Sequence, residues 1–197
     1  PSGKVWIDGT IDGTPATGYA SLGSTADGTL LVDALTLDLP GLRAWGSGGI
    51  ANGKAGSSTV EFEATDLAPL AALAALDLRG RASGRIMLAD SGDRASVAVR
   101  LDGVSVAGGT SVTAASITAD IAEPFGVAPR LDAGRITARG LTAGGTTLAE
   151  PQIDLSGDGY RLAPEAIARG GAVVVAALLA VPLAVLGARR LWAALVL

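Results

Sequence analysis

The chain contains neither cysteine nor histidine, and these two absences remove most of the side chains that enzymes use. Without cysteine there is no disulfide, no thiolate nucleophile and no sulfur ligand for a metal. Without histidine the usual general base, the Ser-His-Asp arrangement and the commonest zinc ligand are missing as well. The composition therefore favours a protein that binds or scaffolds over an enzyme, and we expect no catalytic residues, metal or cofactor.

Aromatic residues are also scarce, at 4%, although hydrophobic residues make up 49% of the 197 residues. Much of the hydrophobic share is alanine, and the 28 glycines favour turns and bulges over long helices. Charged residues form 17% of the chain and give a net charge of −4, with the basic residues spread singly. Because this distribution leaves no basic patch, we expect no nucleic-acid partner.

The chain repeats itself between residues 96 and 158. Residues 101–110, LDGVSVAGGT, are echoed by residues 138–146, ARGLTAGGT, with one residue dropped before the paired glycines. A looser third copy begins at Asp27 and leads to Leu35 and Leu37. Short strands punctuated by Gly and Thr at a regular interval are typical of a β-array whose units stack on one another. Such arrays usually work through a long surface.

Alternation of apolar and polar residues predicts short strands along most of the chain. It marks residues 5–8, 35–39, 60–64, 86–88, 97–102, 117–121, 136–138 and 153–155, with turns expected at Asp8-Gly9, Pro40-Gly41 and residues 90–93. Alternation with a single apolar face describes a sheet that is sheltered on one side only. We therefore expect a mainly-β fold, an elongated and curled antiparallel sheet that forms a groove and is built of short repeats.

One stretch breaks the alternation and predicts a short Ala/Leu helix over residues 66–77. Asp66 stands at the N-cap position and Pro69 lies in the first turn. About a dozen residues are too few to cross a bilayer, which needs roughly 20. Because the helix is apolar nearly all round, we expect it to be buried, either packed on the sheet or plugging its open side. Its groove-associated residues would be Leu67, Leu70, Leu73 and Leu76.

The tail changes character at Ala172. Residues 170–188 carry no charged side chain, and Arg189, Arg190 and Trp192 follow them. The pattern predicts an apolar helix over 172–197 that is marginally long enough to span a membrane, kinked at Pro182. There are two alternatives: a buried apolar helix, or a non-native end such as a frame shift in a GC-rich gene would give.

The expected organisation is a β-repeat segment 1–64, the helix 65–78, a second β-repeat segment 79–158 with two copies, and a linker with the tail, 159–197. Because the chain starts at Pro1, inside a running strand, we expect it to be a fragment or a processed segment.

Several short motifs hint at other chemistry. Gly46–Ala51 matches a dinucleotide fingerprint, but no buried strand precedes it and no helix follows, so we expect a glycine-rich hairpin. Asp8–Gly13 hints at a calcium loop without the required carboxylate spacing, so we expect two turns. Glu61 and Glu63 share one strand face and are expected to be solvated. Three arginines are expected to be surface charges, with acidic lipid head groups as the alternative role: Arg79, Arg81 and Arg85.

Residues 65–84, TDLAPLAALAALDLRGRASG, resemble the DLAPL…L…L.G…G segment of the TamB family, the translocation and assembly module proteins related to AsmA. The Gly-Gly-Thr repeats and residues 121–126, IAEPFG, are similar to repeats of alphaproteobacterial members. The resemblance covers about residues 1–158. It implies a β-taco in the periplasm, anchored to the inner membrane and partnered with an Omp85-type outer-membrane barrel. It also implies a part in outer-membrane protein assembly, protein secretion and phospholipid movement between membranes, without catalytic residues.

The apolar face of such a sheet would form a trough for phospholipid acyl chains. Apolar area that leaves water there contributes about 25 cal/mol per Å2, and a row of aliphatic side chains binds without specific polar contacts. The predicted groove lining is Val97, Val99, Leu101, Ile117, Ile121, Ile136, Ile153 and Leu155. The alternative is a β-solenoid or adhesin-like repeat protein that binds through its outer surface. A hydrolase on a β-scaffold is the third possibility, and the missing histidine and cysteine argue against it.

Overall fold

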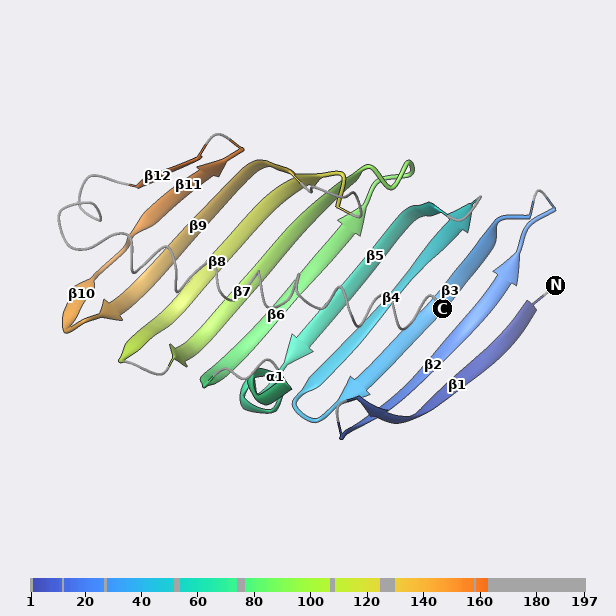
Figure 1. The fold of residues 1–197 in the computed structure, drawn as a ribbon, viewed down its shortest axis with the longest axis horizontal. Coiled ribbons are helices and arrows are strands. Elements are labelled where there is room, and N and C mark those ends of the chain that lie inside the picture. The colour runs from blue at the N-terminus through green and yellow to red at the C-terminus, as the bar shows by residue number, and fades with distance from the viewer. Residues whose placement is uncertain are drawn as a thin grey trace.

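The chain folds into one antiparallel sheet of twelve strands with a short helix at one edge, in a computed structural model (Figure 1). The structure describes residues 2–11, 13–26, 28–51, 54–73, 77–106, 109–124, 130–157 and 159–162. The elements in chain order are β1 (Ser2–Ile11), β2 (Thr14–Ser24), β3 (Leu30–Leu39), β4 (Leu42–Ala51), β5 (Lys54–Ala64), α1 (Ala68–Leu73), β6 (Leu78–Leu88), β7 (Arg94–Val106), β8 (Thr110–Ala122), β9 (Arg130–Ala143), β10 (Thr146–Leu148), β11 (Gln152–Ser156) and β12 (Gly159–Leu162).

The sheet is a meander in which each strand pairs with the next along the chain. Its order is β1-β2-β3-β4-β5-β6-β7-β8-β9-β11-β12, and β10 pairs beside β11 on the same edge of β9. β1 and β12 lie at opposite ends and do not pair, so the sheet is open and elongated (Figure 1). Short connections force neighbouring strands to run antiparallel. The predicted mainly-β, elongated antiparallel sheet is thus confirmed, and the two predicted β-repeat segments form one sheet because β5 pairs with β6 directly.

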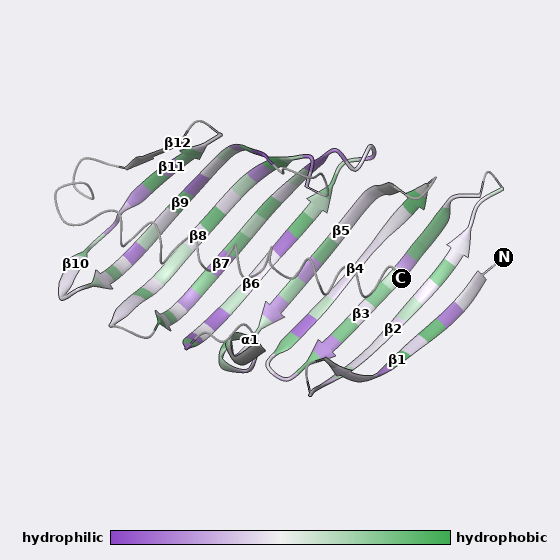
Figure 2. Ribbon diagram, in the orientation of Figure 1, coloured by the Kyte–Doolittle hydropathy of each residue, from purple (hydrophilic) through white to green (hydrophobic). Residues whose placement is uncertain are grey.

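The strand register aligns apolar residues in rows that cross the sheet. Val99 stands opposite Ile117, Ile117 opposite Ile136, and Ile136 opposite Ile153. The same row continues over the first half of the sheet through Leu37, Ala44, Phe62 and Gly84. Alternate residues of each strand point to the opposite face. The bands of hydrophobic and hydrophilic residues in Figure 2 follow this alternation.

The connection between β5 and β6 holds α1, as the Asp66 N-cap predicts. The amide of Ala68 donates to the Asp66 carboxylate at 2.9 Å, which satisfies a donor that the first turn leaves free. Leu67 and Ala71 are buried in the hydrophobic cluster of the sheet. The helix is described over six residues, shorter than the predicted 66–77. Residues 74–76 lie outside the described residues, and Asp77 is no longer helical.

The two copies of the repeat occupy equivalent hairpins, β7–β8 and β9–β10, at the same ends of the strands. Gly103 on β7 and Gly140 on β9 have left-handed φ angles of 59° and 62°. Both flank Thr113 of β8, where the ladder is interrupted on either side. Glycine reaches this conformation without the strain that a Cβ brings, so the repeated glycine marks a repeated local distortion. The looser third copy begins at the opposite ends of the strands, in the connection between β2 and β3.

Several local predictions need correction or fall outside the described residues. The predicted turn at Asp8-Gly9 is wrong, because β1 continues through both residues to Ile11. The glycine-rich segment Gly46–Ala51 lies within β4 and is followed by β5, so the hairpin begins only after it. The turns at Pro40-Gly41 and at residues 90–93 are confirmed. The predicted apolar tail, 172–197, lies outside the described residues.

Candidate functional site

The structure brings the predicted groove residues together on the apolar face. Five of them belong to one buried cluster: Val99, Leu101, Ile117, Ile136 and Ile153. Val97 and Leu155 are partly buried and pack against that cluster. Ile121 is buried as well but lies outside it, near the end of β8. Seven of the eight predicted residues are therefore contiguous, and Ile136, at 0% exposure, is the most enclosed of them.

Burial of this face changes along the sheet. From β7 to β11 most of its aliphatic side chains are buried, whereas from β3 to β6 only Leu39, Ala64, Leu78 and Ala82, near α1, are buried and the others are half-buried. The half-buried residues are Leu35, Leu37, Val60, Phe62, Ile86 and Leu88. A sheet normally buries its apolar face against a second layer, and the described residues contain no second sheet. The stretch from β3 to β6 is thus the accessible part of the apolar face.

The helix residues of the predicted site are placed only in part. Leu67 is buried and its amide donates to the carbonyl oxygen of Gly80 at 2.9 Å, which ties the start of the helix to β6. Leu70 and Leu73 belong to α1, but their side chains are not among those described, and Leu76 lies outside the described residues. The buried N-terminal part of α1 therefore packs at the edge of the sheet beside β6.

The opposite face carries polar residues joined by ion pairs across the strands. Glu61 accepts hydrogen bonds from Arg85 and, at 2.7 Å, from the Trp45 indole Nε1. The Arg85 hydrogen bond, followed by the Trp45 hydrogen bond, lowers the pKa of Glu61 below its ordinary value. On the same face, toward the other end of the sheet, Arg135 on β9 donates to Asp154 on β11 at 2.8 Å and lowers the pKa of that carboxyl group. Arg85, Arg135 and Asp154 are exposed and Glu61 is half-buried, so each ion pair contributes little stability alone.

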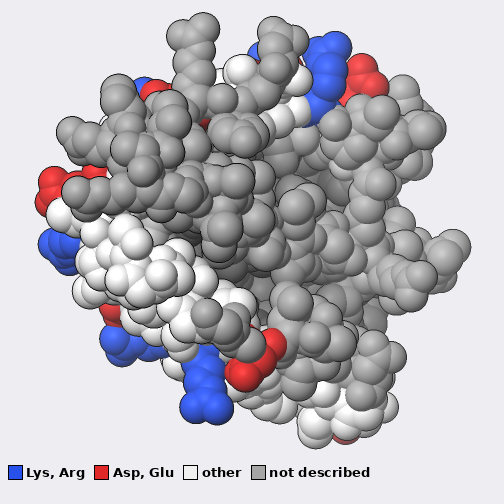
Figure 3. Space-filling view, turned by 60° about the vertical axis from the view of Figure 1, so that its left-hand side comes forward, with Lys and Arg blue, Asp and Glu red and all other residues white. Residues whose placement is uncertain are grey.

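The three arginines that the sequence pattern assigns to the surface all face carboxylates. Arg79 lies 4.0 Å from Asp77, Arg81 lies 2.5 Å from Asp102, and Arg85 pairs with Glu61. These side chains are largely exposed, as predicted for surface charge. In the space-filling view, basic and acidic side chains of the described residues lie close to one another (Figure 3).

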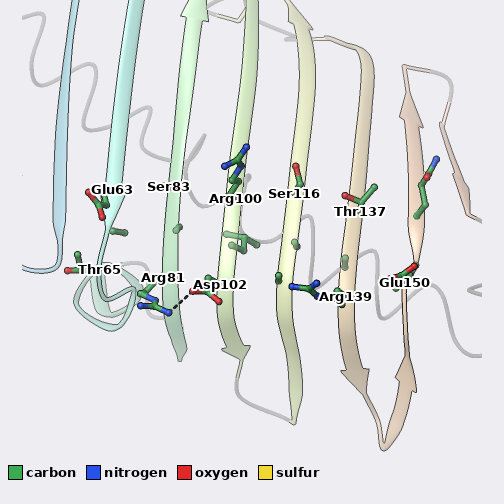
Figure 4. Close-up of a pocket in the computed structure, with 18 residues that line it drawn as sticks. Glu63, Thr65, Arg81, Ser83, Arg100, Asp102, Ser116, Thr137, Arg139 and Glu150 are labelled. Carbon is green, nitrogen blue, oxygen red and sulfur yellow. Dashed lines mark hydrogen bonds and ion pairs between the residues drawn. The ribbon is translucent and has the colours of Figure 1, made fainter.

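A groove of about 960 Å3 crosses the polar face from β5 to β11 (Figure 4). Two parallel rows of side chains form its sides. The first row is Glu63, Ser83, Arg100, Ser116, Thr137 and Gln152, each opposite the next in the strand register. The second is Thr65, Arg81, Asp102, Ala114, Arg139 and Glu150. Between the rows run residues of the apolar face, such as Leu101, whose backbone forms the floor. A second groove, of about 660 Å3, lies over β3–β5 beside Trp45.

These grooves cannot be found from the sequence alone, because they depend on strand register. Alternation identified Arg100 and Asp102 as residues of the polar face, but it does not tell which residue of the next strand stands opposite. The small side chains that leave room in the groove, Ser83 and Ser116, carry no signal of their own in the sequence. Only their alignment on either side of Arg100 makes them part of a site.

The carboxylates near the grooves do not have the arrangement of an acid–base pair. Glu63 and Glu150 lie at opposite ends of the large groove, separated by five strand spacings, or roughly 24 Å. Asp102 lies between them and forms an ion pair with Arg81. Glu61 and Glu63 both line the smaller groove on one strand face. A general acid requires a raised pKa, whereas the pKa of Glu61 is lowered by Arg85 and Trp45. This geometry gives no support to hydrolase chemistry.

The described part of the chain gives no metal centre and no membrane helix. No group of three or more metal-ligating side chains is found within it. Among the same residues no helix is long and apolar enough to cross a bilayer. Compared with known proteins, the chain matches no family model, no curated protein and no solved structure.

Proposed function

We propose that the apolar face of this sheet carries phospholipid acyl chains, as part of a periplasmic protein of the TamB and AsmA type. The observation that carries the proposal is the pair of apolar rows that cross the strands on one face of an open sheet. One row runs through Leu37, Ala44, Phe62 and Val99, and its neighbour through Leu35, Val60, Ile86 and Val97. The resemblance of residues 65–84 supports the family, and with it an inner-membrane anchor, an Omp85-type partner and a part in outer-membrane assembly and protein secretion.

The dimensions of the accessible face fit an acyl chain. From β3 to β6 the rows cross three strand spacings, or roughly 14 Å. The hydrocarbon core of a bilayer is about 30 Å thick, so the chains of one leaflet extend about 15 Å. Each methylene group that leaves water contributes about 0.8 kcal/mol. Aliphatic side chains without polar groups hold such a chain without fixing its position, which suits transport.

The open antiparallel sheet argues against the solenoid alternative. A β-solenoid closes its apolar side into a dry core between stacked coils, whereas the end strands of this sheet, β1 and β12, each pair on one side only. Half-buried side chains from β3 to β6 also leave part of the apolar face accessible. Both observations favour binding on the apolar face over binding on the outer surface of a closed repeat.

Transfer of a fluorescent phospholipid between donor and acceptor vesicles tests the proposal. The full chain is expected to accelerate transfer, and a variant carrying Leu35→Asp, Leu37→Asp and Ile86→Asp is expected to lose that acceleration. The matched control places the same charges on the polar face, with Thr36→Asp, Ser47→Asp and Thr59→Asp, and is expected to retain it. Circular dichroism checks that both variants keep the sheet. Equal transfer by the two folded variants, or no acceleration by the unmodified chain, would overturn the proposal.

A further inference from the structure

The large groove on the polar face contains two arginines that no described carboxylate neutralises. Arg100 and Arg139 both line the groove, and neither takes part in any of the ion pairs of the described residues. Arg81, in the same groove, differs because Asp102 lies 2.5 Å away. Glu150 follows β10 close to Arg139, yet no ion pair joins the two. The groove therefore holds two positive charges with unused hydrogen-bond donors.

The two arginines stand on opposite sides of β8. Arg100 projects from β7 and Arg139 from β9, and the two are offset by two residues along the strands, because Arg100 stands opposite Ser116 and Arg139 opposite Ala114. Their backbones are therefore roughly 12 Å apart. Arg139 extends toward β8 (Figure 4). Between them β8 presents only small side chains, Ala114 and Ser116, on the polar face. In Figure 4 the Arg100 side chain extends along β7, away from Arg139. An anion seated over this part of β8, beside the Ser116 hydroxyl, contacts both guanidinium groups once the exposed Arg100 side chain turns toward β8.

We propose that this part of the groove binds the phosphate group of a water-soluble ligand. A carboxylate has two oxygens in one plane, and a single arginine satisfies both. A phosphate has oxygens that point in several directions, which suits two guanidinium groups approaching from opposite sides together with the hydroxyls of Ser116 and Thr137.

The surroundings favour a soluble source over a membrane. The exposed large hydrophobic residues of the described chain are Val5, Trp6, Leu30 and Met87, and none of them lines this groove. The groove also lies on the face opposite the apolar rows, so one lipid cannot occupy both places. The phosphate site is thus independent of the proposed acyl-chain site, and either can fail without the other.

Titration of the full chain with inorganic phosphate, followed by phosphorus NMR at low ionic strength, tests the site. We expect saturable binding, and a loss of affinity of about tenfold or more in Arg100→Gln and in Arg139→Gln, because each loses a charge-assisted hydrogen bond. Arg94→Gln is the matched control: Arg94 lies on the same strand and face as Arg100, roughly 20 Å away, and does not line the groove. It is expected to change affinity less than twofold.

Four outcomes would overturn the site. The first is the absence of saturable phosphate binding, and the second is an equal loss in all three variants, which would indicate general charge attraction. The third is binding to vesicles that contain phosphatidylglycerol without binding to inorganic phosphate. The fourth is an affinity for acetate, the carboxylate used for comparison, equal to the affinity for phosphate. Urea unfolding of each variant confirms that the exposed substitutions leave the sheet folded.

Discussion

Phe62 on β5 and Gly84 on β6 stand directly opposite each other, and the phenyl ring covers the space where a side chain at Gly84 would lie. A Cβ atom at Gly84 would be 2.7 Å from Cε1 of the ring and 2.6 Å from the carbonyl oxygen of Ala98. This contact lies in the apolar row that joins the half-buried part of the face to its buried part. The absence of a side chain at Gly84 therefore lets Phe62 pack against the cluster.

Replacement of Gly84 by alanine is expected to destabilise the sheet. The added methyl group forces the Phe62 ring or the backbone of β7 to move, and overpacking of this kind costs about 1–3 kcal/mol. Gly3→Ala is the control, because a Cβ at Gly3 meets nothing within 4 Å. Urea unfolding measures both. Equal stability of the two variants would show that Phe62 does not occupy the space above Gly84.

The two glycines of the repeat should respond differently to the same substitution. Both have left-handed φ angles, so alanine at either position brings strain of about 1–2 kcal/mol. At Gly140 the new Cβ would also clash with the Thr113 hydroxyl, whereas at Gly103 it meets nothing within 4 Å. Gly140→Ala is therefore expected to lower the free energy of unfolding more than Gly103→Ala. Adding Thr113→Ser to Gly140→Ala should not recover the extra loss of stability, because the hydroxyl remains. Adding Thr113→Ala should recover part of it.

Acid is expected to weaken the polar face through Glu61. Its pKa is lowered in the folded chain by the hydrogen bonds from Arg85 and Trp45. The stabilisation is therefore present above the pKa of the unfolded chain, near 4.5, and is lost as the pH falls through the lower pKa of the folded state. Urea unfolding at several pH values between neutral and acid should show a shallower loss of stability for Glu61→Gln than for the unmodified chain. Identical pH profiles would rule out this contribution.

Burial along the apolar face predicts a graded response to truncation. Ile136 is fully buried, so Ile136→Ala is expected to lower the free energy of unfolding by about 3 kcal/mol, through lost transfer energy and the cavity that remains. Leu37 stands in the same row but is only half-buried, so Leu37→Ala is expected to cost about half as much. Denaturant unfolding compares the two variants directly. A larger loss at Leu37 would contradict the difference in accessibility between the two ends of the face.

The sequence predicts the strands in which apolar and polar residues alternate, and it predicts the helix that begins at a recognisable N-cap residue. β7, β8 and β9 show clear alternation, and Asp66 followed by Pro69 marks the start of α1. β2 and β4 were not predicted as strands, because Thr, Ala, Gly and Ser give little alternation. Pairing with neighbours on both sides keeps these two segments extended, and that stabilisation lies outside each segment's own sequence.

The composition of the apolar face was predictable, whereas the polar groove was not. Val99, Ile117, Ile136 and Ile153 share a face because of alternation within each strand, and antiparallel pairing then places them in one row. The position of Arg100 between Ser83 and Ser116 depends on register across three strands and on the interruption of the ladder near Gly80 and Gly103. Register is set by the assembled sheet, so no single segment encodes the groove.

Photo-crosslinking to a labelled phospholipid tests the proposed acyl-chain site most directly. A photoreactive amino acid is placed at Leu37 or Phe62 on the apolar face and, in matched variants, at the next position on the polar face, Asp38 or Glu63. With vesicles that contain the labelled lipid, we predict that positions 37 and 62 form lipid adducts and that positions 38 and 63 do not. Equal labelling of both faces, or no adduct at positions 37 and 62 in a folded chain, would contradict the account.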